Sequence, residues 1–339
     1  MTPAKAANPD KLPSARLGSW LMLIVSAVAA LGQAVPASAA AATPGFRAVT
    51  SIKLGFPAGE VAVNPATNKV YVAAFANGLV VVNGRTDTVV TTIHAGTDLT
   101  ELAVDPATGK IYAGDATNGN VYVINGRTNT VTATIPLHFG VMALAADPAS
   151  DMIYAATSGG AVSVISGATN TVTAAIPVSA GALAINSVTG TLYAAEPQAM
   201  AVISEQTNQV TGTVPLPSGP DSLAVDEATN TIYASVGAIS GAARPRGVAV
   251  ISGQTDTVTA TIGLPGRPED VAVNPTTNYV YAVNRKLADI WKISGTTDKV
   301  FAKLPLPAPS SDLATNPENN TAYTTPNAGG IHDLTVLKG

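Results

Sequence analysis

The feature that most constrains this chain is an internal repeat with a mean spacing of about 42 residues. The segment VAVNPATNKVYVA occurs in seven versions, which begin at Val61, Leu102, Leu144, Leu183, Leu223, Val271 and Leu313. Successive versions start 39 to 48 residues apart. Each interval holds four strand-sized segments rich in Val, Thr and Ile, and none shows an apolar period of helix length. Each repeat therefore predicts one small antiparallel sheet.

Turn residues and one tyrosine recur at fixed places in every repeat. An Asn or Asp opens the turn after the first strand, at positions 64, 105, 147, 186, 226, 274 and 316. Four residues later comes a position expected to be left-handed, occupied by Asn68, Gly109, Asp151, Gly190, Asn230, Asn278 and Asn320. The recurrent tyrosines are Tyr71, Tyr112, Tyr154, Tyr193, Tyr233, Tyr281 and Tyr323. We expect these rings to pack between neighbouring sheets, with each hydroxyl reaching a backbone partner.

Repeats of 40–45 residues with four strands each are typical of β-propellers. The seventh repeat stops at Gly339, before its fourth strand, and residues 48–52 (AVTSI) match the fourth strand VTATI at 258–262. Val61 follows Ile52 by nine residues, as Val271 follows Ile262. The sequence thus predicts an all-β, seven-bladed β-propeller over residues 40–339, in which the N-terminal strand completes the last four-stranded antiparallel blade.

Residues 1–39 differ from the repeats and are typical of a secretory signal peptide. Basic residues come first, an apolar run follows at 20–31, and Ala37-Ser38-Ala39 matches a cleavage site. The apolar run of 12 residues is shorter than the roughly 20 that a membrane span requires. We expect cleavage near Ala39, no membrane span afterwards, and a secreted, extracellular or periplasmic and cell-envelope location. An uncleaved anchor is the alternative.

Composition excludes several classes of site. The chain has no cysteine, and therefore no disulfide, thiolate metal site or cysteine nucleophile. Without residues 1–39 it keeps 15 basic and 21 acidic residues, a net charge of −6. Because Lys and Arg supply most of the affinity for phosphate backbones, nucleic acid is not expected as a partner. We expect a monomer.

The strands VYVA, IYAG, IYAA and LYAA are followed by strands of the type V-x-V-I-[DNS]-G, as in VYVING, and T-[DN]-x-V-x-[AT]-x-I, as in TNTVTATI, with departures in single repeats. This pattern resembles the YVTN β-propeller repeat family over residues 46–339. The resemblance implies a seven-bladed propeller, commonly exported, periplasmic or in a surface layer, and it implies no reaction. More distantly, the chain is similar to the superfamily of calcium-dependent gluconolactonases and streptogramin lyases, but no catalytic His or Glu set maps onto it.

The residue just before the first strand of each repeat suggests one candidate site. These positions hold Glu60, Glu101, Ala143, Ala182, Ser222, Asp270 and Asp312. In a closed ring the four acids fall on consecutive blades, and Asp98, Asp221 and Glu269 lie in the same loops. Converging carboxylates suit a cationic ligand or Ca²⁺, the only cofactor that the sequence suggests. Glu60, Glu101, Asp270 and Asp312 are thus candidate metal or ligand residues, the alternative being solvated acids in open loops.

Basic residues and one tryptophan suggest further contacts. The longest departure from the repeat, residues 235–247, carries Arg244 and Arg246, and Arg267, Arg285 and Lys286 are expected nearby. Such a cluster suits a carboxylate, a sulfate or a polysaccharide anion, or it is a solvated loop. Trp291 replaces smaller residues of the other repeats. It is either a platform for a sugar or partner, or a space-filling core residue.

The favoured function is an exported, noncatalytic binding or scaffold protein. Its loop face around the central channel would be presented to a protein, a glycan or a small-molecule ligand. The alternative is a cation-dependent lactonase, hydrolase or lyase that uses the mouth carboxylates. A redox or quinoprotein-linked propeller is disfavoured by the absence of cysteine and of a haem motif.

Overall fold

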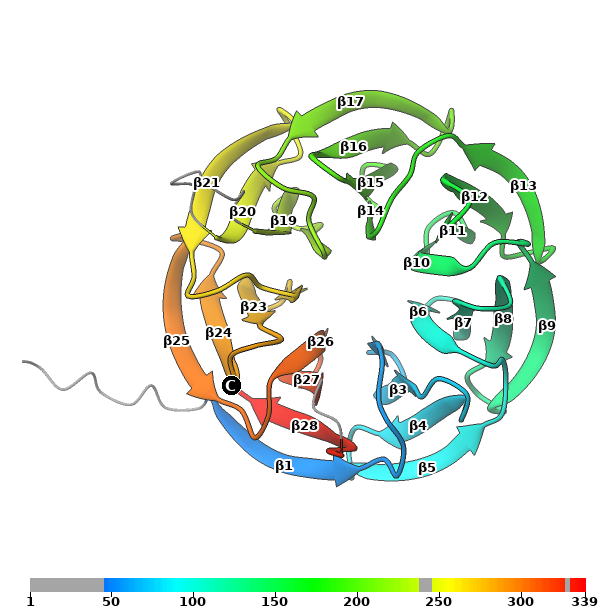
Figure 1. Ribbon diagram of the computed structural model, residues 1–339, viewed down its shortest axis with the longest axis horizontal. Coiled ribbons are helices and arrows are strands. Elements are labelled where there is room, and N and C mark those ends of the chain that lie inside the picture. The colour runs from blue at the N-terminus through cyan, green and yellow to red at the C-terminus, as the bar shows by residue number, and fades with distance from the viewer. Residues whose placement is uncertain (1–45, 238–245, 327–329) are drawn as a thin grey trace, which may run out of the picture. The chain divides into compact units, whose positions relative to one another are not determined.

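The computed structural model describes residues 46–237, 246–326 and 330–339. These residues form strands β1 to β28 and no helix. The strands make seven four-stranded antiparallel sheets, arranged as blades around a central axis (Figure 1). The predicted all-β, seven-bladed propeller is confirmed. The proposed signal peptide, residues 1–39, lies outside the described residues, as does Arg244.

Each blade runs outward from a first strand at the centre. Blades 1 and 2 are formed by β2 (Val61–Asn64), β3 (Lys69–Ala73), β4 (Leu79–Asn83), β5 (Thr88–Ile93), β6 (Leu99–Asp105), β7 (Lys110–Asp115), β8 (Asn120–Asn125) and β9 (Thr130–Pro136). Blades 3 and 4 are formed by β10 (Val141–Asp147), β11 (Met152–Thr157), β12 (Ala161–Ser166), β13 (Thr171–Ile176), β14 (Leu183–Asn186), β15 (Thr191–Glu196), β16 (Ala199–Ser204) and β17 (Gln209–Pro215).

The remaining blades have the same order. Blades 5 and 6 are formed by β18 (Leu223–Asp226), β19 (Thr231–Val236), β20 (Gly247–Ser252), β21 (Thr257–Gly263), β22 (Asp270–Asn274), β23 (Tyr279–Val283), β24 (Asp289–Ser294) and β25 (Lys299–Pro305). Blade 7 consists of β26 (Ser310–Asn316), β27 (Thr321–Pro326), β28 (Asp333–Lys338) and β1 (Arg47–Lys53).

The ring is closed by its first strand, as predicted. Strand β1 pairs antiparallel with β28, and Ile52 lies opposite Leu334. In Figure 1 the blue N-terminal strand lies beside the red C-terminal strand. Closure leaves each blade in contact with two neighbours and protects most sheet edges.

The repeated turns are formed as predicted. The side-chain oxygen of Asn64 accepts a hydrogen bond from the backbone N–H of Thr67 at 3.2 Å. Positive φ angles occur at every predicted left-handed position: Asn68, Gly109, Asp151, Gly190, Asn230, Asn278 and Asn320. Some turn amides also join blades, since Asn186 Nδ2 donates to Asn230 Oδ1 of the next blade at 2.8 Å.

The tyrosines are buried between blades, but the expectation that each hydroxyl reaches a backbone partner is wrong: among the described residues, no tyrosine hydroxyl bonds a backbone atom. Within the described part of the chain, the hydroxyls of Tyr71, Tyr112 and Tyr323 have no hydrogen-bond partner. The Tyr71 hydroxyl instead lies against Gly126 of the next blade, 2.8 Å from where a Cβ would stand. The end of the tyrosine ring fits because Gly126 has no side chain. Burial raises the pKa of Tyr71 to about 12.

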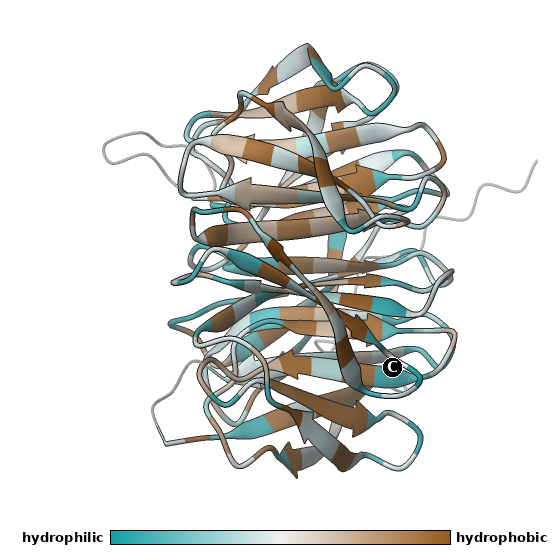
Figure 2. Ribbon diagram, turned by 90° about the vertical axis from the view of Figure 1, so that its right-hand side faces the viewer, coloured by the Kyte–Doolittle hydropathy of each residue, from teal (hydrophilic) through white to brown (hydrophobic). Residues whose placement is uncertain are grey.

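Seen edge-on, the hydrophobic residues lie along the strands, whereas the loops at the two faces are largely hydrophilic (Figure 2). Apolar side chains therefore pack between the blades, and the loops remain available for function. Among the described residues, no helix is long and apolar enough to cross a membrane.

Candidate functional site

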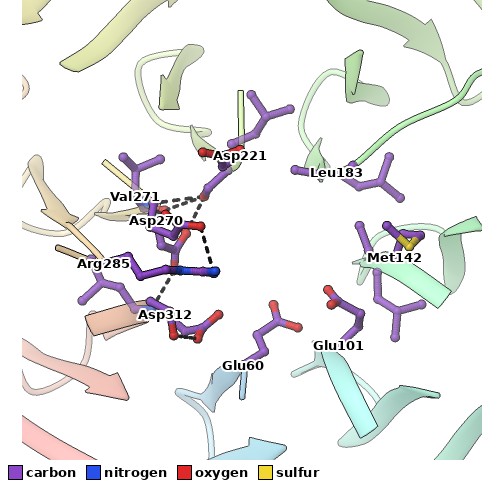
Figure 3. A pocket seen from close by; sticks show the side chains of 18 residues that line it. Glu60, Glu101, Met142, Leu183, Asp221, Asp270, Val271, Arg285 and Asp312 are labelled. Atoms are coloured by element: carbon purple, nitrogen blue, oxygen red, sulfur yellow. Dashed lines mark hydrogen bonds and ion pairs between the residues drawn. The ribbon is translucent and has the colours of Figure 1, made fainter. Parts of the chain in front are cut away.

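A hollow of about 290 Å³ lies where the chain enters the first strands of the blades, and four of the seven candidate positions lie inside those strands rather than before them. All seven equivalent repeat positions line it: Glu60, Glu101, Ala143, Ala182, Ser222, Asp270 and Asp312. The four acids come from blades 6, 7, 1 and 2, which are consecutive in the ring. The structure therefore brings together carboxyl groups from both ends of the sequence (Figure 3).

Asp270 uses both carboxylate oxygens inside the ring. Its Oδ1 accepts hydrogen bonds from the backbone N–H of Val271 at 2.8 Å and from the Ser222 hydroxyl of blade 5. Its Oδ2 accepts the backbone N–H of Leu313 in blade 7 at 2.6 Å. Asp270 thus links three consecutive blades, and its first role is structural.

The other three carboxyls keep acceptor capacity. Glu60 accepts the backbone N–H of Leu102 through Oε2, and its Oε1 accepts no bond from the described residues. Among the described residues, Asp312 accepts side-chain hydrogen bonds through Oδ2 alone, from the hydroxyls of Ser311 at 2.5 Å and Thr325 at 3.3 Å. The Glu101 carboxyl accepts no hydrogen bond of normal geometry within the described chain.

Crowding in the wall of the hollow changes the acidity of these groups. Burial, followed by the nearby Asp312 carboxyl, raises the pKa of Glu101 to about 8. Burial and Asp312 likewise raise the pKa of Asp270 to about 7. The pKa of Glu60 is raised well above its usual range by burial and by Glu101. Near neutral pH the hollow therefore holds protons that an entering cation would displace.

The opposite side of the hollow carries apolar residues in place of acids, of which only Met142 is well exposed. Blades 3 and 4 contribute Met142, Ala143, Leu144, Ala182 and Leu183. Met142 is 47% exposed and faces the acids across the hollow (Figure 3). Sequence reasoning missed this side. The sequence does carry a signal for it. At the repeat position just before the candidate acids, Met142 is the one large apolar residue, and the other repeats have Gly59, Thr100, Gly181, Asp221, Glu269 and Ser311.

Two ion pairs separate this hollow from a second, basic one. Arg285 Nη2 lies 2.8 Å from Glu269 Oε1, and Arg267 pairs with Asp221. The second hollow, of about 490 Å³, is shared by blades 5 and 6. Arg246 and Lys286 also line it, and neither forms an ion pair within the described residues. The two hollows share Asp221, Glu269 and Arg285 as lining residues, and therefore adjoin.

The basic hollow contains an ordering residue that the sequence did not indicate. Asn284 is 3% exposed, and its Oδ1 accepts the backbone N–H groups of Lys286 at 2.8 Å and Leu287 at 3.1 Å. This arrangement fixes the turn that carries Arg285 and Lys286.

Two predicted ligand residues are not brought to either hollow. Asp98 accepts a hydrogen bond from the Thr117 hydroxyl at 2.9 Å, within the loops of blade 2. Trp291 is 2% exposed and packs among Val250 of blade 5 and Val280 of blade 6. The surface platform is corrected to a space-filling core residue, because its strand position points between blades.

The carboxyls do not fit a chelated calcium ion. Ca²⁺ takes six to eight oxygen ligands around one point. Within the described residues, no three His, Asp or Glu side chains gather closely enough to hold a metal ion. Glu60, Glu101 and Asp312 instead line a curved wall, which suits a larger cation with directional N–H groups.

Comparison with known proteins identifies the architecture. The chain matches no protein-family model and no curated protein sequence. Among solved structures, it is similar to a chain of the hydrazine synthase of Kuenenia stuttgartiensis. The TM-score is 0.73 and the sequences are 15% identical, over 86% of this chain and 98% of that chain. At this identity the likeness shows the propeller fold alone.

Proposed function

We propose that this chain is an exported, noncatalytic binding propeller of the YVTN repeat type, whose loop face binds a small ligand with an ammonium group. The observation that carries the proposal is the composition of the central hollow. Carboxyl groups with free oxygens line one side, and the exposed Met142 side chain faces them from the other. An amine with an aliphatic part meets both sides, since its N–H groups form charge-assisted hydrogen bonds while its chain is buried.

The adjoining basic hollow extends this ligand class. Arg246 and Lys286 have no acidic partner among the described residues, and the segment 238–245 beside Arg246 contains no Asp or Glu. A carboxylate there would meet guanidinium and ammonium donors. A zwitterion that reaches across the Arg285–Glu269 ion pair would place its ammonium group in the acidic hollow and its carboxylate in the basic hollow. We therefore favour an amino acid or a similar zwitterion over a simple amine.

Two features favour binding over catalysis. Carboxylate oxygens of Asp270 and Glu60 accept hydrogen bonds from the next blade. Carboxyls held in this way are better suited to form a rigid binding wall than to transfer protons. The arrangement of the acids also argues against the cation-dependent lactonase, hydrolase or lyase alternative, which would depend on a chelated divalent ion. Export is supported by the pattern of residues 1–39.

The test is calorimetric titration with matched probes: hexylamine, hexanoate, 6-aminohexanoate and CaCl₂. We expect 6-aminohexanoate to bind more tightly than hexylamine, and hexanoate to bind weakly. Because a bound ammonium lowers the pKa values of the wall carboxyls, binding should release protons, which is measured as a dependence of the heat on the buffer. Binding of hexylamine but not of 6-aminohexanoate would refute the zwitterion and keep the amine. Binding of neither would refute the proposed function.

Two variants locate the binding event. Glu101→Gln should weaken hexylamine binding by about tenfold or more, because it removes a charge-assisted acceptor. Asp98→Asn removes an acid that directly precedes β6 and lines neither hollow, and it should leave the affinity unchanged. A calcium-induced rise in melting temperature, accompanied by hydrolysis of a lactone probe, would instead favour the enzyme.

A further inference from the structure

Blade 6 departs from the repeat at a buried position. In six blades the second-strand tyrosine lies opposite a valine of the third strand: Val81, Val123, Val164, Val202, Val250 and Val336. In blade 6 Tyr281 lies opposite Lys292. Lys292 is only 4% exposed and forms no hydrogen bond or ion pair with any residue that the structure describes.

Two other residues of blade 6 that differ from the repeat lie close to this lysine. In blades 2 to 5 a fourth-strand threonine donates its hydroxyl to the carbonyl of the valine, as Thr132 does to Val123 at 3.1 Å. Blade 6 has Phe301 there. Tyr279 stands where the other blades have Lys, Met or Thr: Lys69, Lys110, Met152, Thr191, Thr231 and Thr321.

The fourth ring comes from the neighbouring blade. Phe46 precedes β1 and stands where the other blades have the left-handed turn residues Asp87, Asn129, Asn170, Asn208, Asp256 and Asp298. No turn joins β28 to β1, because these strands belong to opposite ends of the sequence. The position is therefore free to carry an aromatic ring.

The four rings surround the Lys292 ammonium. Nζ lies 4.1 Å from the ring centroid of Tyr279, 5.2 Å from that of Phe46, and 5.8 Å from those of Tyr281 and Phe301. All four distances are within the range of cation–π attraction. Gly339 is packed against this cage, because a Cβ there would lie 3.1 Å from Nζ and 2.8 Å from the Phe46 ring.

We propose that Lys292 and its cage of Tyr279, Tyr281, Phe301 and Phe46 form a clasp that holds the N-terminal strand in blade 7. Two opposing effects decide its strength. Burial without a charged partner disfavours the ammonium and lowers the pKa of Lys292. Four aromatic faces favour it, most strongly where water is excluded. Since Phe46 alone comes from outside blade 6, the attraction makes ring closure depend on this contact, whereas a valine would pack without such a preference.

Hydrogen exchange of the full chain, followed by mass spectrometry, tests the clasp. Lys292→Met keeps the length of the side chain and removes its charge, and Lys292→Val restores the residue of the other blades. In both variants we expect amides of β1 (Arg47–Lys53) to exchange about tenfold faster or more. Amides of blade 3 should be unchanged. Lys338→Met, which removes an exposed charge from the adjacent β28, should leave β1 as protected as in the wild type.

A double-mutant cycle separates the cation from ordinary packing. Phe46→Leu should accelerate exchange of β1 in the wild type and much less in Lys292→Met, because the ring and the ammonium act through one contact. Additive effects of the two substitutions would overturn the clasp. Unchanged or increased protection of β1 in Lys292→Met and Lys292→Val would overturn it as well, since burial of the charge would then outweigh the attraction.

Discussion

Two acids at the same repeat position have different physical roles. Asp270 accepts three hydrogen bonds, two of them from neighbouring blades, whereas Glu101 accepts none of normal geometry within the described residues. Both have raised pKa values, chiefly through burial. Glu101 has fewer hydrogen-bond donors than Asp270 among the described residues, so hydrogen bonding stabilises its ionised form less. Under the proposed function, Glu101 would serve ligand binding at the expense of stability.

The Glu101 carboxyl should make stability depend on pH. Its folded-state pKa of about 8 lies above the usual 4.5, so the folded state binds a proton that the unfolded state has lost between these values. Stability therefore falls as pH rises through this window. In the wild type the free energy of unfolding should fall between pH 5 and pH 8. In Glu101→Gln we expect this fall to be smaller by about 1–2 kcal/mol, as measured by chemical denaturation. Parallel pH profiles for the two proteins would contradict this account.

At the scale of elements, the blades interlock through a tyrosine on one and a glycine on the next. Tyr233 of blade 5 meets Gly295 of blade 6 as Tyr71 meets Gly126. Blade 4 has Glu205 in place of this glycine. There the left-handed turn residue is Gly190, whose missing side chain leaves room for the glutamate. Neighbouring positions therefore compensate for each other within one blade.

This interlock predicts unequal costs for two glycine substitutions in blades 5 and 6. A Cβ on Gly295 would lie 2.8 Å from the Tyr233 hydroxyl and 2.0 Å from Asn278 Oδ1, whereas one on Gly263 has no atom within 4 Å. We expect Gly295→Ala to lower the free energy of unfolding by about 1–3 kcal/mol. Gly263→Ala should change it by no more than about 0.5 kcal/mol. Urea denaturation measures both, and equal effects would show that the contact is not tight.

For the molecule as a whole, stability depends on joining its two ends. Blade 7 consists of three C-terminal strands and one N-terminal strand, so the ring is complete only when β1 is paired. Without β1, the outer edge of β28 would expose unpaired backbone groups, which promote association with other chains.

Removal of residues 1–53 should therefore yield a protein that associates, detected by light scattering and size-exclusion chromatography. A synthetic peptide of residues 44–56 added in trans should restore the molecular size of the full chain, because it supplies the missing strand. A peptide of the same composition in scrambled order is the control. A truncated protein with the same association state and melting temperature as the full chain would show that closure by β1 is dispensable.

The sequence by itself determined the strands, the turns, the number of blades and the strand that closes the ring. These features are encoded locally, since turn chemistry and strand pattern recur in every repeat and each blade contacts its neighbours. The repeat also located the acids, because closure makes Glu60, Glu101, Asp270 and Asp312 neighbours.

Only the tertiary structure decided which carboxyls keep free oxygens, that Met142 faces them, and that Trp291 is buried. It alone brought Phe46 to Lys292. These outcomes depend on contacts between side chains of different blades, at positions where the chain departs from its own repeat. A periodic pattern shows which position each residue holds, but the partner that a departing side chain meets is set by the packing of the closed ring.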